Sequence, residues 1–247
     1  MKIRWAVIFS LAWFASCVNL RDQPPLDELI AMNTAARGGA PAIEAVRDYD
    51  SDIHIVEPSF EVDGRYVATR DGSMRVDILM DGERVLTEAL HDGRGWSWSP
   101  GGGVTDASAQ GVAALRHGIE FPFKLFGVHE MERRGHRLTT AGREKIGKIE
   151  YDVLTLTLDD GHESRYYLNP DTGLIERERQ FRAMHVDVDP TPVWIETEYS
   201  DYCPVGEVLF PHRQVERRLD SGAVLSTLTI KAIRLNQEPA GNPFLPP

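Results

Sequence analysis

Residues 147–182 read GKIEYDVLTLTLDDGHESRYYLNPDTGLIERERQFR, and this stretch decides the fold of the chain. From 151 to 158 β-branched and aromatic side chains occupy every second position, the period of two that is typical of a strand. Asp160-Gly161 and then Pro170 to Gly173 mark two reversals, because these residue types accept the dihedral angles of tight turns. Strand, turn, strand, turn, strand predicts an antiparallel meander.

The same pattern fills most of the remaining chain. Asp-Gly pairs, a strong hairpin signal, occur at positions 63–64, 71–72, 81–82 and 92–93. At Asp63-Gly64 the strand pattern continues on both sides, which favours a bulge there. We count about eleven strands, and without βαβ alternation they predict a single antiparallel sheet that is long enough to curl strongly. The fold class is therefore mainly β.

Short helices are expected at two places. Residues 26–37 carry Leu26, Leu29 and Ile30 on one face and end at Gly38-Gly39, and a brief turn follows at 42–46. Asp106 can cap a second helix over 107–117. Residues 127–146 are charged and contain glycine, so we interpret them as a loop or an edge segment. The two helices are candidates to cover the concave face of the curved sheet.

Composition limits the class of protein. The chain has 247 residues and a formal net charge of −11, with 42% hydrophobic and 26% charged residues. These values indicate a globular domain, and an acidic chain of this kind is not expected to bind nucleic acid. We expect one domain over residues 26–247 and a monomer.

The N-terminus has the features of a secretory signal. Lys2 and Arg4 precede an uncharged apolar run that is too short to span a bilayer comfortably. Residues 14–17, Phe-Ala-Ser-Cys, resemble the lipobox of bacterial lipoproteins. We therefore predict a signal peptide over 1–16, lipidation of Cys17 and a tether over 17–25. The alternative is an ordinary signal peptide that leaves a soluble periplasmic or secreted protein.

Cys203 is the only other cysteine. An oxidising compartment would permit a bridge between Cys17 and Cys203. Because Cys17 lies at the edge of the signal, we favour lipidation of Cys17 and a single buried Cys203.

The apolar stretch Ile119 to Phe126 is interrupted by Pro122, which prevents regular strand pairing. It is either ordinary core or the wall of a pocket. Aromatic side chains exceed what a flat sheet face needs, and pockets for apolar ligands are lined by such residues. The candidate ligand-binding residues are Trp96, Trp98, Phe121, Phe123, Leu125, Phe126 and Trp194. Val112 and Leu115 would face the ligand from helix 107–117, which lies between glycines and could act as a lid.

No motif predicts catalysis, a metal or a cofactor. The sequence lacks His-Glu-x-x-His, Cys-x-x-Cys and Gly-x-Ser-x-Gly. His185, Asp187 and Asp189 would share one face of a strand and could hold a metal, but a solvated strand end is the favoured interpretation. His162 beside Glu163 is too weak a pair to predict acid–base chemistry. We therefore expect a protein that is not an enzyme.

The order of elements resembles the LolA/LolB-like fold over residues 26–247. Three stretches carry the resemblance: 29–39 in the opening helix, 165–175 in the meander, and 229–236 with the later Phe-Leu-Pro. The resemblance implies an unclosed, half-open β-barrel whose hollow is covered by helices. Members of that family carry acylated lipoproteins across the periplasm or receive them at the outer membrane, and the receptor is itself a lipoprotein.

Three functions follow as hypotheses. The first is an envelope lipoprotein that binds an acyl chain or a lipoprotein in its hollow, anchored to the outer membrane because Val18 rather than Asp follows Cys17. The second is an accessory lipoprotein that binds protein partners through its sheet edge or lid. The third, a periplasmic hydrolase that uses His162, His185 or nearby acidic residues, has the least support.

Overall fold

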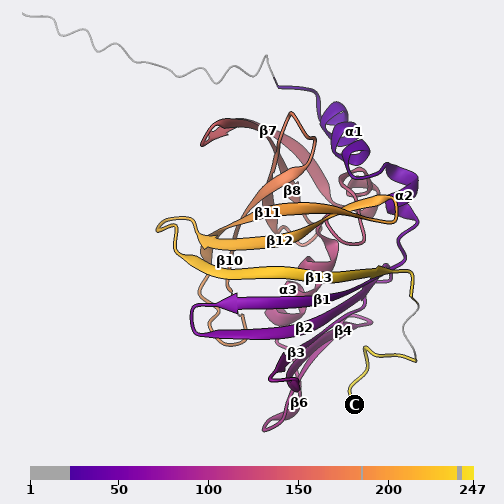
Figure 1. The fold of residues 1–247 in the computed structure, drawn as a ribbon, viewed down its shortest axis with the longest axis vertical. Coiled ribbons are helices and arrows are strands. Elements are labelled where there is room, and N and C mark those ends of the chain that lie inside the picture. Colours follow the sequence, from indigo (N-terminus) through magenta and orange to yellow (C-terminus); the bar gives the residue numbers. More distant parts are fainter. Residues whose placement is uncertain (1–22, 185, 238–240) are drawn as a thin grey trace, which may run out of the picture.

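The computed structural model describes residues 23–184, 186–237 and 241–247. Within them one antiparallel sheet has the strand order β6-β5-β4-β3-β2-β1-β13-β12-β11-β10-β9-β8-β7 (Figure 1). The helices are α1 Leu26–Ala36, α2 Ala40–Glu44 and α3 Ala109–Glu120, with 3-10 turns at Val128–Glu130 and Glu132–Arg134. The strands are β1 Asp48–Glu57, β2 Phe60–Thr69, β3 Met74–Met80, β4 Glu83–His91, β5 Arg94–Ser99, β6 Gly103–Asp106, β7 Arg137–Ile146, β8 Ile149–Thr157, β9 Glu163–Leu168, β10 Ile175–Arg182, β11 Val193–Val205, β12 Val208–Arg218 and β13 Val224–Leu235.

The expected fold class is confirmed: the protein is mainly β, and its single sheet curves without closing. Two strands were missed, and both are edge strands, β6 and β7. β6 lies in a glycine-rich and fully exposed segment, and β7 lies in the charged segment 127–146. Edge strands need few buried side chains, so their apolar alternation is weak.

The Asp-Gly pairs follow the turn prediction with one exception. At 81–82 and 92–93 both residues have positive φ, as the hairpin turn requires, and Asp71-Gly72 also lies in a turn. Asp63-Gly64 instead lies inside β2, whose register with β1 runs without a bulge. A Cβ on Gly64 would stand 2.8 Å from the Asp77 carbonyl oxygen, so close strand approach explains this glycine.

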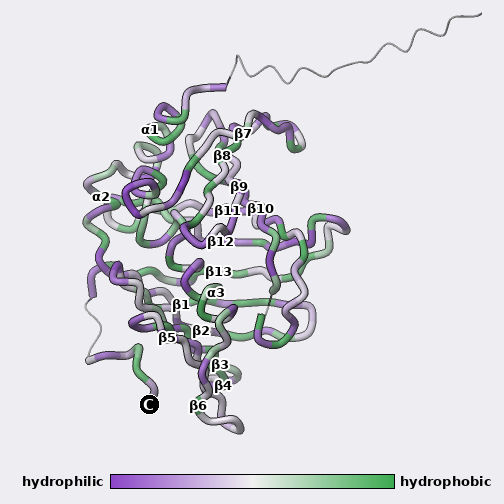
Figure 2. The backbone as a smooth tube through the Cα atoms, turned by 180° about the vertical axis from the view of Figure 1, so that it is seen from behind, coloured by the Kyte–Doolittle hydropathy of each residue, from purple (hydrophilic) through white to green (hydrophobic). Residues whose placement is uncertain are grey.

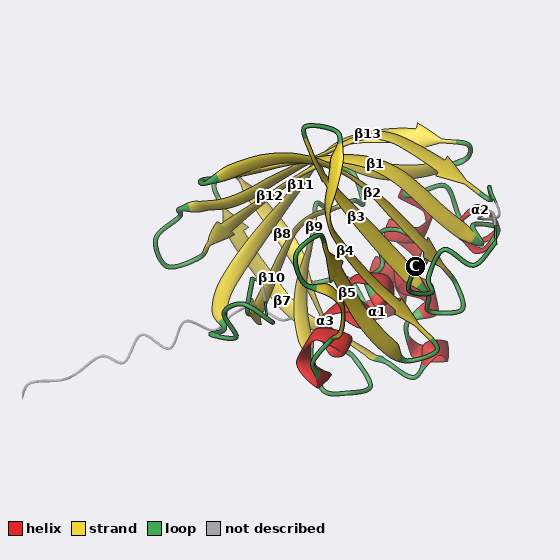
Figure 3. Cartoon of the chain, turned by 90° about the horizontal axis from the view of Figure 1, so that it is seen from below, coloured by secondary structure: helices red, strands yellow, loops and turns green. Residues whose placement is uncertain are grey.

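The helix predictions are confirmed, with a different cap for α3. Ser108 rather than Asp106 is the N-cap, because the Ser108 hydroxyl accepts a hydrogen bond from the Gly111 amide. Asp106 is the last residue of β6. Figure 3 shows the sheet arching over the helices, which lie on its concave side.

The position of α3 shows which side chains lie on the concave face of the sheet. A Cβ on Gly95 would meet Val112 and Leu115 of α3 at 2.9 and 3.5 Å, so Gly95 faces that helix. Gly95 is opposite Leu90, which is opposite Met74, and these residues share the concave face. The main core cluster lies on this face, and in Figure 2 apolar and polar residues alternate along the strands.

The strand connections gather at two ends of the sheet. At the helix end, Asn33 of α1 donates a hydrogen bond to the Gly173 carbonyl in the β9–β10 turn, and Leu209 after the β11–β12 turn donates to the Arg37 carbonyl. At the other end, called here the distal rim, lie the connections β1–β2, β3–β4, β5–β6, β8–β9, β10–β11 and β12–β13. Among its described residues, the distal rim has no backbone hydrogen bond of this kind with α1 or α2.

Candidate functional site

The predicted segment 121–126 lies in the concave core. Phe123, Leu125 and Phe126 are 6%, 0% and 1% exposed and belong to the main core cluster, and half-buried Phe121 packs against it. The Phe123 ring stacks on Tyr199 with a centroid distance of 4.1 Å. These side chains are packed together and fill the helix end of the hollow. They do not line an open pocket.

Trp96 and Trp98 lie on the convex face, which corrects the expectation that they line the hollow. Trp96 donates a hydrogen bond to the Phe244 carbonyl oxygen at 2.8 Å, and the Arg84 guanidinium lies 4.2 Å from the Trp98 ring centroid. The physical reason is the period of two: Gly95 takes the concave position to admit α3, so its neighbour must point outward. Val112 and Leu115 face the sheet at Gly95, and their role as a lid over a ligand stays a prediction.

Trp194 is also separated from the apolar segment. It is opposite Phe181 in the β10–β11 pair, and the two rings lie 5.5 Å apart. Both side chains are about half exposed, at 47% and 50%. The register places Phe181 next to Gln180, which faces the concave side, so this aromatic pair projects from the convex side at the distal rim.

Arg37 fixes the apolar segment through its backbone. This residue is 2% exposed, and its guanidinium donates to the carbonyl oxygens of Pro122, Phe123 and Phe126 at 2.6, 2.9 and 3.1 Å. Burial lowers the Arg37 pKa to about 10, and the group stays charged at neutral pH. No pattern in the sequence indicates this role, because Arg37 looks like an ordinary residue at the end of a helix.

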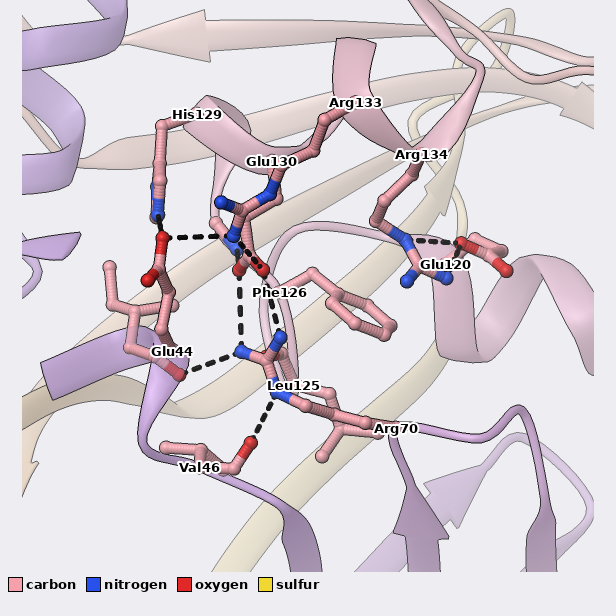
Figure 4. A network of polar contacts seen from close by, with 12 residues as sticks. Glu44, Val46, Arg70, Glu120, Leu125, Phe126, His129, Glu130, Arg133 and Arg134 are labelled. Atoms are coloured by element: carbon pink, nitrogen blue, oxygen red, sulfur yellow. Dashed lines mark hydrogen bonds and ion pairs between the residues drawn. The ribbon is translucent and has the colours of Figure 1, made fainter. Parts of the chain in front are cut away.

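Arg70 and Glu130 form a second set of polar contacts that hold the apolar segment in place (Figure 4). Arg70 donates to the carbonyl oxygens of Ile43, Val46 and Leu125 and pairs with the Glu130 carboxylate at 2.8 Å. Burial opposes ionisation of Glu130, yet hydrogen bonds from Arg70, the Gly127 amide and Arg133 lower its pKa to about 2. Arg37, Arg70 and Glu130, named here the arginine knot, tie α1, α2 and β2 to segment 122–127.

A second buried polar group lies on the concave face of β9, β10 and β11. Ser164 is opposite Gln180 and Tyr166 is opposite Glu178, and all four are at most 4% exposed. Tyr199 on β11 donates its hydroxyl to the Glu178 carboxylate at 2.6 Å, and the Gln180 amide donates to the other carboxylate oxygen. These five residues are named here the Glu178 cluster. Burial raises the pKa of Glu178.

Several polar atoms in and beside this cluster have no hydrogen-bond partner. They are the Ser164 hydroxyl, the Tyr166 hydroxyl, the Gln180 Oε1 atom, the His162 Nε2 atom and the Tyr66 hydroxyl. Burial first, and then the charge of His117, lowers the pKa of His162 to about 4, so its ring is neutral at pH 7. The pattern is unusual because nearly all buried polar groups in folded proteins are paired.

Lys124 lies close enough to the cluster for its ammonium to be attracted by the Glu178 carboxylate. Its ammonium lies 4.8 Å from the Tyr66 ring centroid and donates to the Gly118 carbonyl oxygen at 3.2 Å. Burial lowers the Lys124 pKa to about 8, against the attraction of Glu178. Sequence reasoning missed both charged residues, because each sits among apolar or alternating neighbours where no short motif marks it.

Helix α3 crosses from β5 to the β8–β9 turn, near the two edges of the open sheet. Arg116 and His117 pair with Asp160 at 2.7 Å each, and the His117 ring stacks on His162 at 4.2 Å. At the other end of the helix, the Ser108 hydroxyl donates to Asp187 in the β10–β11 connection at 2.5 Å. The predicted lid is therefore held by polar contacts near its ends and by apolar packing of Val112, Leu115 and the buried Ile119 on the sheet side.

Exposed apolar side chains concentrate at the distal rim. Of the ten large ones that are exposed in the described residues, all but Leu245 lie there. They are Val56, Phe60, Met80, Val104, Phe181, Val188, Trp194, Leu219 and Val224. Such clustering marks a surface that meets an apolar partner more often than it marks chance.

A small apolar pocket of about 360 Å³ opens at the helix end. Its lining comes from α2, the β11–β12 turn and the end of β13, and includes Ala42, Val46, Val205, Val208 and Leu235. None of the predicted ligand-binding residues lines it.

The described residues contain no cluster of side chains that could hold a metal ion. His185 lies outside them, Asp187 is bonded to Ser108, and Asp189 accepts from the Thr191 amide. Cys203 is exposed rather than buried, which corrects that prediction, because β11 is irregular around Asp201. Cys17 and the predicted signal peptide lie outside the described residues. None of the described helices is long and apolar enough to cross a membrane.

Comparison with solved structures identifies the fold. The chain superposes on a putative outer membrane lipoprotein-sorting protein domain from Vibrio parahaemolyticus with a TM-score of 0.59 and 12% identity, over 88% of this chain and 94% of that one. A DUF1329 family protein from Desulfovibrio piger gives 0.56 and 11%, over 87% and 95%. A LolA superfamily protein from Nitrosomonas europaea gives 0.54 and 13%, over 86% and 94%.

These likenesses, together with the open curved sheet and its helical cover, show that the chain has a LolA/LolB-like fold, as the sequence predicted. No family model matches the sequence, and no curated protein matches it either. At 11 to 13% identity the comparison defines the architecture alone.

Proposed function

We propose that this protein is an envelope lipoprotein that binds the acyl chain of a lipid or lipoprotein in the distal part of its hollow. One observation carries the proposal. The concave residues Ile55, Val76, Ile78, Leu86 and Leu228 are only half-buried, although they lie on the same face as the core. They form an apolar floor that α3 covers incompletely, next to the apolar distal rim.

The energetics favour this use of the floor. Transfer of one methylene from water to an apolar surface contributes about 0.8 kcal/mol, so a chain of ordinary length gains enough to bind on a shallow floor. Solved structures of similar architecture include a putative lipoprotein-sorting domain, which supports the same ligand class. Of the predicted binding residues, Phe121, Phe123, Leu125 and Phe126 form the closed end of the hollow, and Val112 and Leu115 form its cover.

The test compares two neighbouring residues of β3 that are both half-buried. Ile78 is on the concave face, opposite Gly64 and Leu86, and Leu79 is on the convex face, opposite Asp63. Ile78→Asn should weaken binding of the apolar fluorophore diphenylhexatriene by about tenfold or more, because it places an amide on the floor. Leu79→Asn should leave binding unchanged. A wild-type protein that does not bind the fluorophore would exclude the acyl-binding function.

The proposal includes the location. A lipidated Cys17 would anchor the domain to the outer membrane on the tether 17–25. Cys17→Ala should move the protein from the membrane fraction to the soluble fraction or leave its signal uncleaved, and mass spectrometry of the N-terminus reports which. Unchanged fractionation together with an unmodified N-terminus would remove the anchor from the proposal.

The distal rim favours a second candidate function, an accessory lipoprotein that binds a partner protein there. The exposed pair Phe181 and Trp194 is its main evidence. A Phe181→Ser, Trp194→Ser double variant should then lose a cross-linked complex that the wild type forms in cells, while it keeps diphenylhexatriene binding. If the fluorophore does not bind and the complex is lost, this second function replaces the first.

A further inference from the structure

The concave face has two halves of different chemistry. On β1 to β4 and β13 most inward residues are apolar, with Ile55, Ile78 and Leu228 as examples and Ser51 and Glu88 as exceptions. On β9 to β11 they include the members of the Glu178 cluster beside the apolar Leu168 and Ile195. The two halves face each other across the curved sheet, so the hollow as a whole is amphipathic. An acyl chain matches the first half and leaves the second without a counterpart.

The second half has unused hydrogen-bonding capacity. Tyr166 is 0% exposed and Ser164 is 1% exposed, and neither hydroxyl makes a hydrogen bond of normal geometry, although Tyr166 lies close to Ser164 and Glu178. The Gln180 Oε1 atom, opposite Ser164, also has none. A buried polar atom without a partner is unfavourable, and such atoms gathered on one face indicate a place where a ligand or an internal water supplies the partners.

We infer that the Glu178 cluster binds the uncharged polar head of the acylated ligand, a group with hydroxyl and carbonyl oxygens such as a glycerol ester or an acyl amide. The inference rests on the proposed acyl-binding function and specifies its ligand class. The hydroxyls of Tyr166 and Ser164 donate to a carbonyl oxygen of the head. The Gln180 Oε1 atom accepts a hydrogen bond from its hydroxyl or amide.

The charges of the site disfavour a phosphate head. A phosphate placed here would meet the Glu178 carboxyl, and like charges at close range repel in a site with little water. The nearby cations are already engaged: Arg182 pairs with Glu216 at 2.5 Å, and Lys124 donates to the Gly118 carbonyl oxygen. A neutral head needs no counter-ion and suits hydroxyl and amide groups.

The ligand would enter under α3 rather than past Phe123. Phe123 is fixed, because Arg37 holds its carbonyl oxygen, and its ring forms the end wall against Tyr199. The C-terminal half of α3 covers His162, at the distal edge of the cluster, through His117. Beside the Asp160 turn this half is held by partly exposed ion pairs from Arg116 and His117, which are weak, whereas its last turn is fastened by Ile119 in the core.

Tyr166→Phe tests the inference, with Tyr167→Phe as the matched control. The two residues are neighbours on β9, and Tyr167 faces the other side, where its hydroxyl donates to Glu144. The Tyr166 hydroxyl lies beside Glu178 and Ser164 but makes no hydrogen bond of normal geometry, so its loss should change the melting temperature of the free protein little. The variant is therefore expected to fold, and a thermal melt checks this.

Binding is measured by displacement of diphenylhexatriene below the micelle-forming concentration, with three ligands that carry the same oleoyl chain. They are monooleoylglycerol, oleoyl lysophosphatidate and a lipopeptide with a dioleoylglyceryl cysteine. The wild type should bind monooleoylglycerol at least about tenfold more tightly than the lysophosphatidate, because only the latter brings a phosphate close to the Glu178 carboxyl. Tyr166→Phe should weaken the monooleoylglycerol by about the same factor and leave diphenylhexatriene unchanged. Tyr167→Phe should change neither.

The outcomes separate the two proposals. Without diphenylhexatriene binding, the acyl-binding function fails. If the fluorophore binds but Tyr166→Phe and wild type hold monooleoylglycerol equally, the head-group inference alone fails and the cluster binds internal water only. Equal affinity for the phosphate and glycerol ligands would also overturn it. Tighter binding of the lipopeptide than of monooleoylglycerol would identify a lipoprotein as the source of the head group, and the reverse would identify a free lipid.

Discussion

The arginine knot and the Glu178 cluster are both groups of buried polar side chains on the concave side, and they differ in how completely they are paired. In the knot, Arg37 and Arg70 donate to carbonyl oxygens of three segments, 43–46, 122–126 and Leu209. Glu130 has three donors. In the cluster, hydroxyl and amide atoms lack partners. The comparison teaches that pairing, rather than burial, distinguishes a structural polar group from a candidate binding site.

The largest expected effect breaks the knot. Arg70→Met leaves the Glu130 carboxylate, which is 2% exposed, without its main partner, and should lower the free energy of unfolding by about 3 kcal/mol or more. Arg65→Met is the control, since that side chain is 57% exposed and its partner Asp50 keeps Arg234. It should cost less than about 1 kcal/mol. Equal losses in urea unfolding would show that the knot is not special.

Low pH should remove the stabilisation that the ionised Glu130 carboxylate provides in the knot. The pKa of Glu130 in the folded protein is about 2, below its ordinary value of 4.5, so its stabilising effect is present above pH 4.5 and is lost as the pH falls through 2. The destabilisation caused by Glu130→Gln should therefore shrink steadily between pH 4.5 and 2. A difference between variant and wild type that stays constant over this range, measured by urea unfolding, would contradict the lowered pKa.

The cluster should respond to pH with the opposite sign. Burial raises the pKa of Glu178, so ionisation of the unfolded chain, from about pH 4.5 upward, makes the wild type less stable. Glu178→Gln lacks this penalty and should gain stability relative to wild type as the pH rises from 4 to 7. Urea unfolding at several pH values measures the difference. A relative loss on raising the pH would mean that the carboxylate is well paired, as Glu130 is.

The smallest expected effect on stability comes from weakening the contacts of helix α3, which covers the hollow. Asp160→Asn removes the partner of Arg116 and His117 at the C-terminal half of α3, and should cost less than about 1 kcal/mol because the carboxylate is partly exposed. Diphenylhexatriene should enter faster in stopped-flow fluorescence, since α3 is held less firmly there. Asp81→Asn, in the β3–β4 turn, is the control. A slower or unchanged entry rate would remove α3 as the gate.

Much of the fold was determined by the sequence alone, because its signals are local. The alternation in 149–182 and the turn residues at 81–82, 92–93 and 160–161 act within a few positions, so strands and hairpins could be predicted. The same period of two places Trp96 and Trp98 on the face opposite Gly95, a consequence that was not drawn from the sequence. Edge strands β6 and β7 were missed because they bury too little to show the pattern.

Only the tertiary structure decided which face of each strand points inward. That choice depends on α3 packing against Gly95, a contact between separate elements, and it sent the two tryptophans to the convex side. The candidate site arose in the same way, since Tyr166, Glu178 and Tyr199 meet only when β9, β10 and β11 pair. Period two determines which residues lie together on a strand, whereas burial is decided by what the curved sheet encloses.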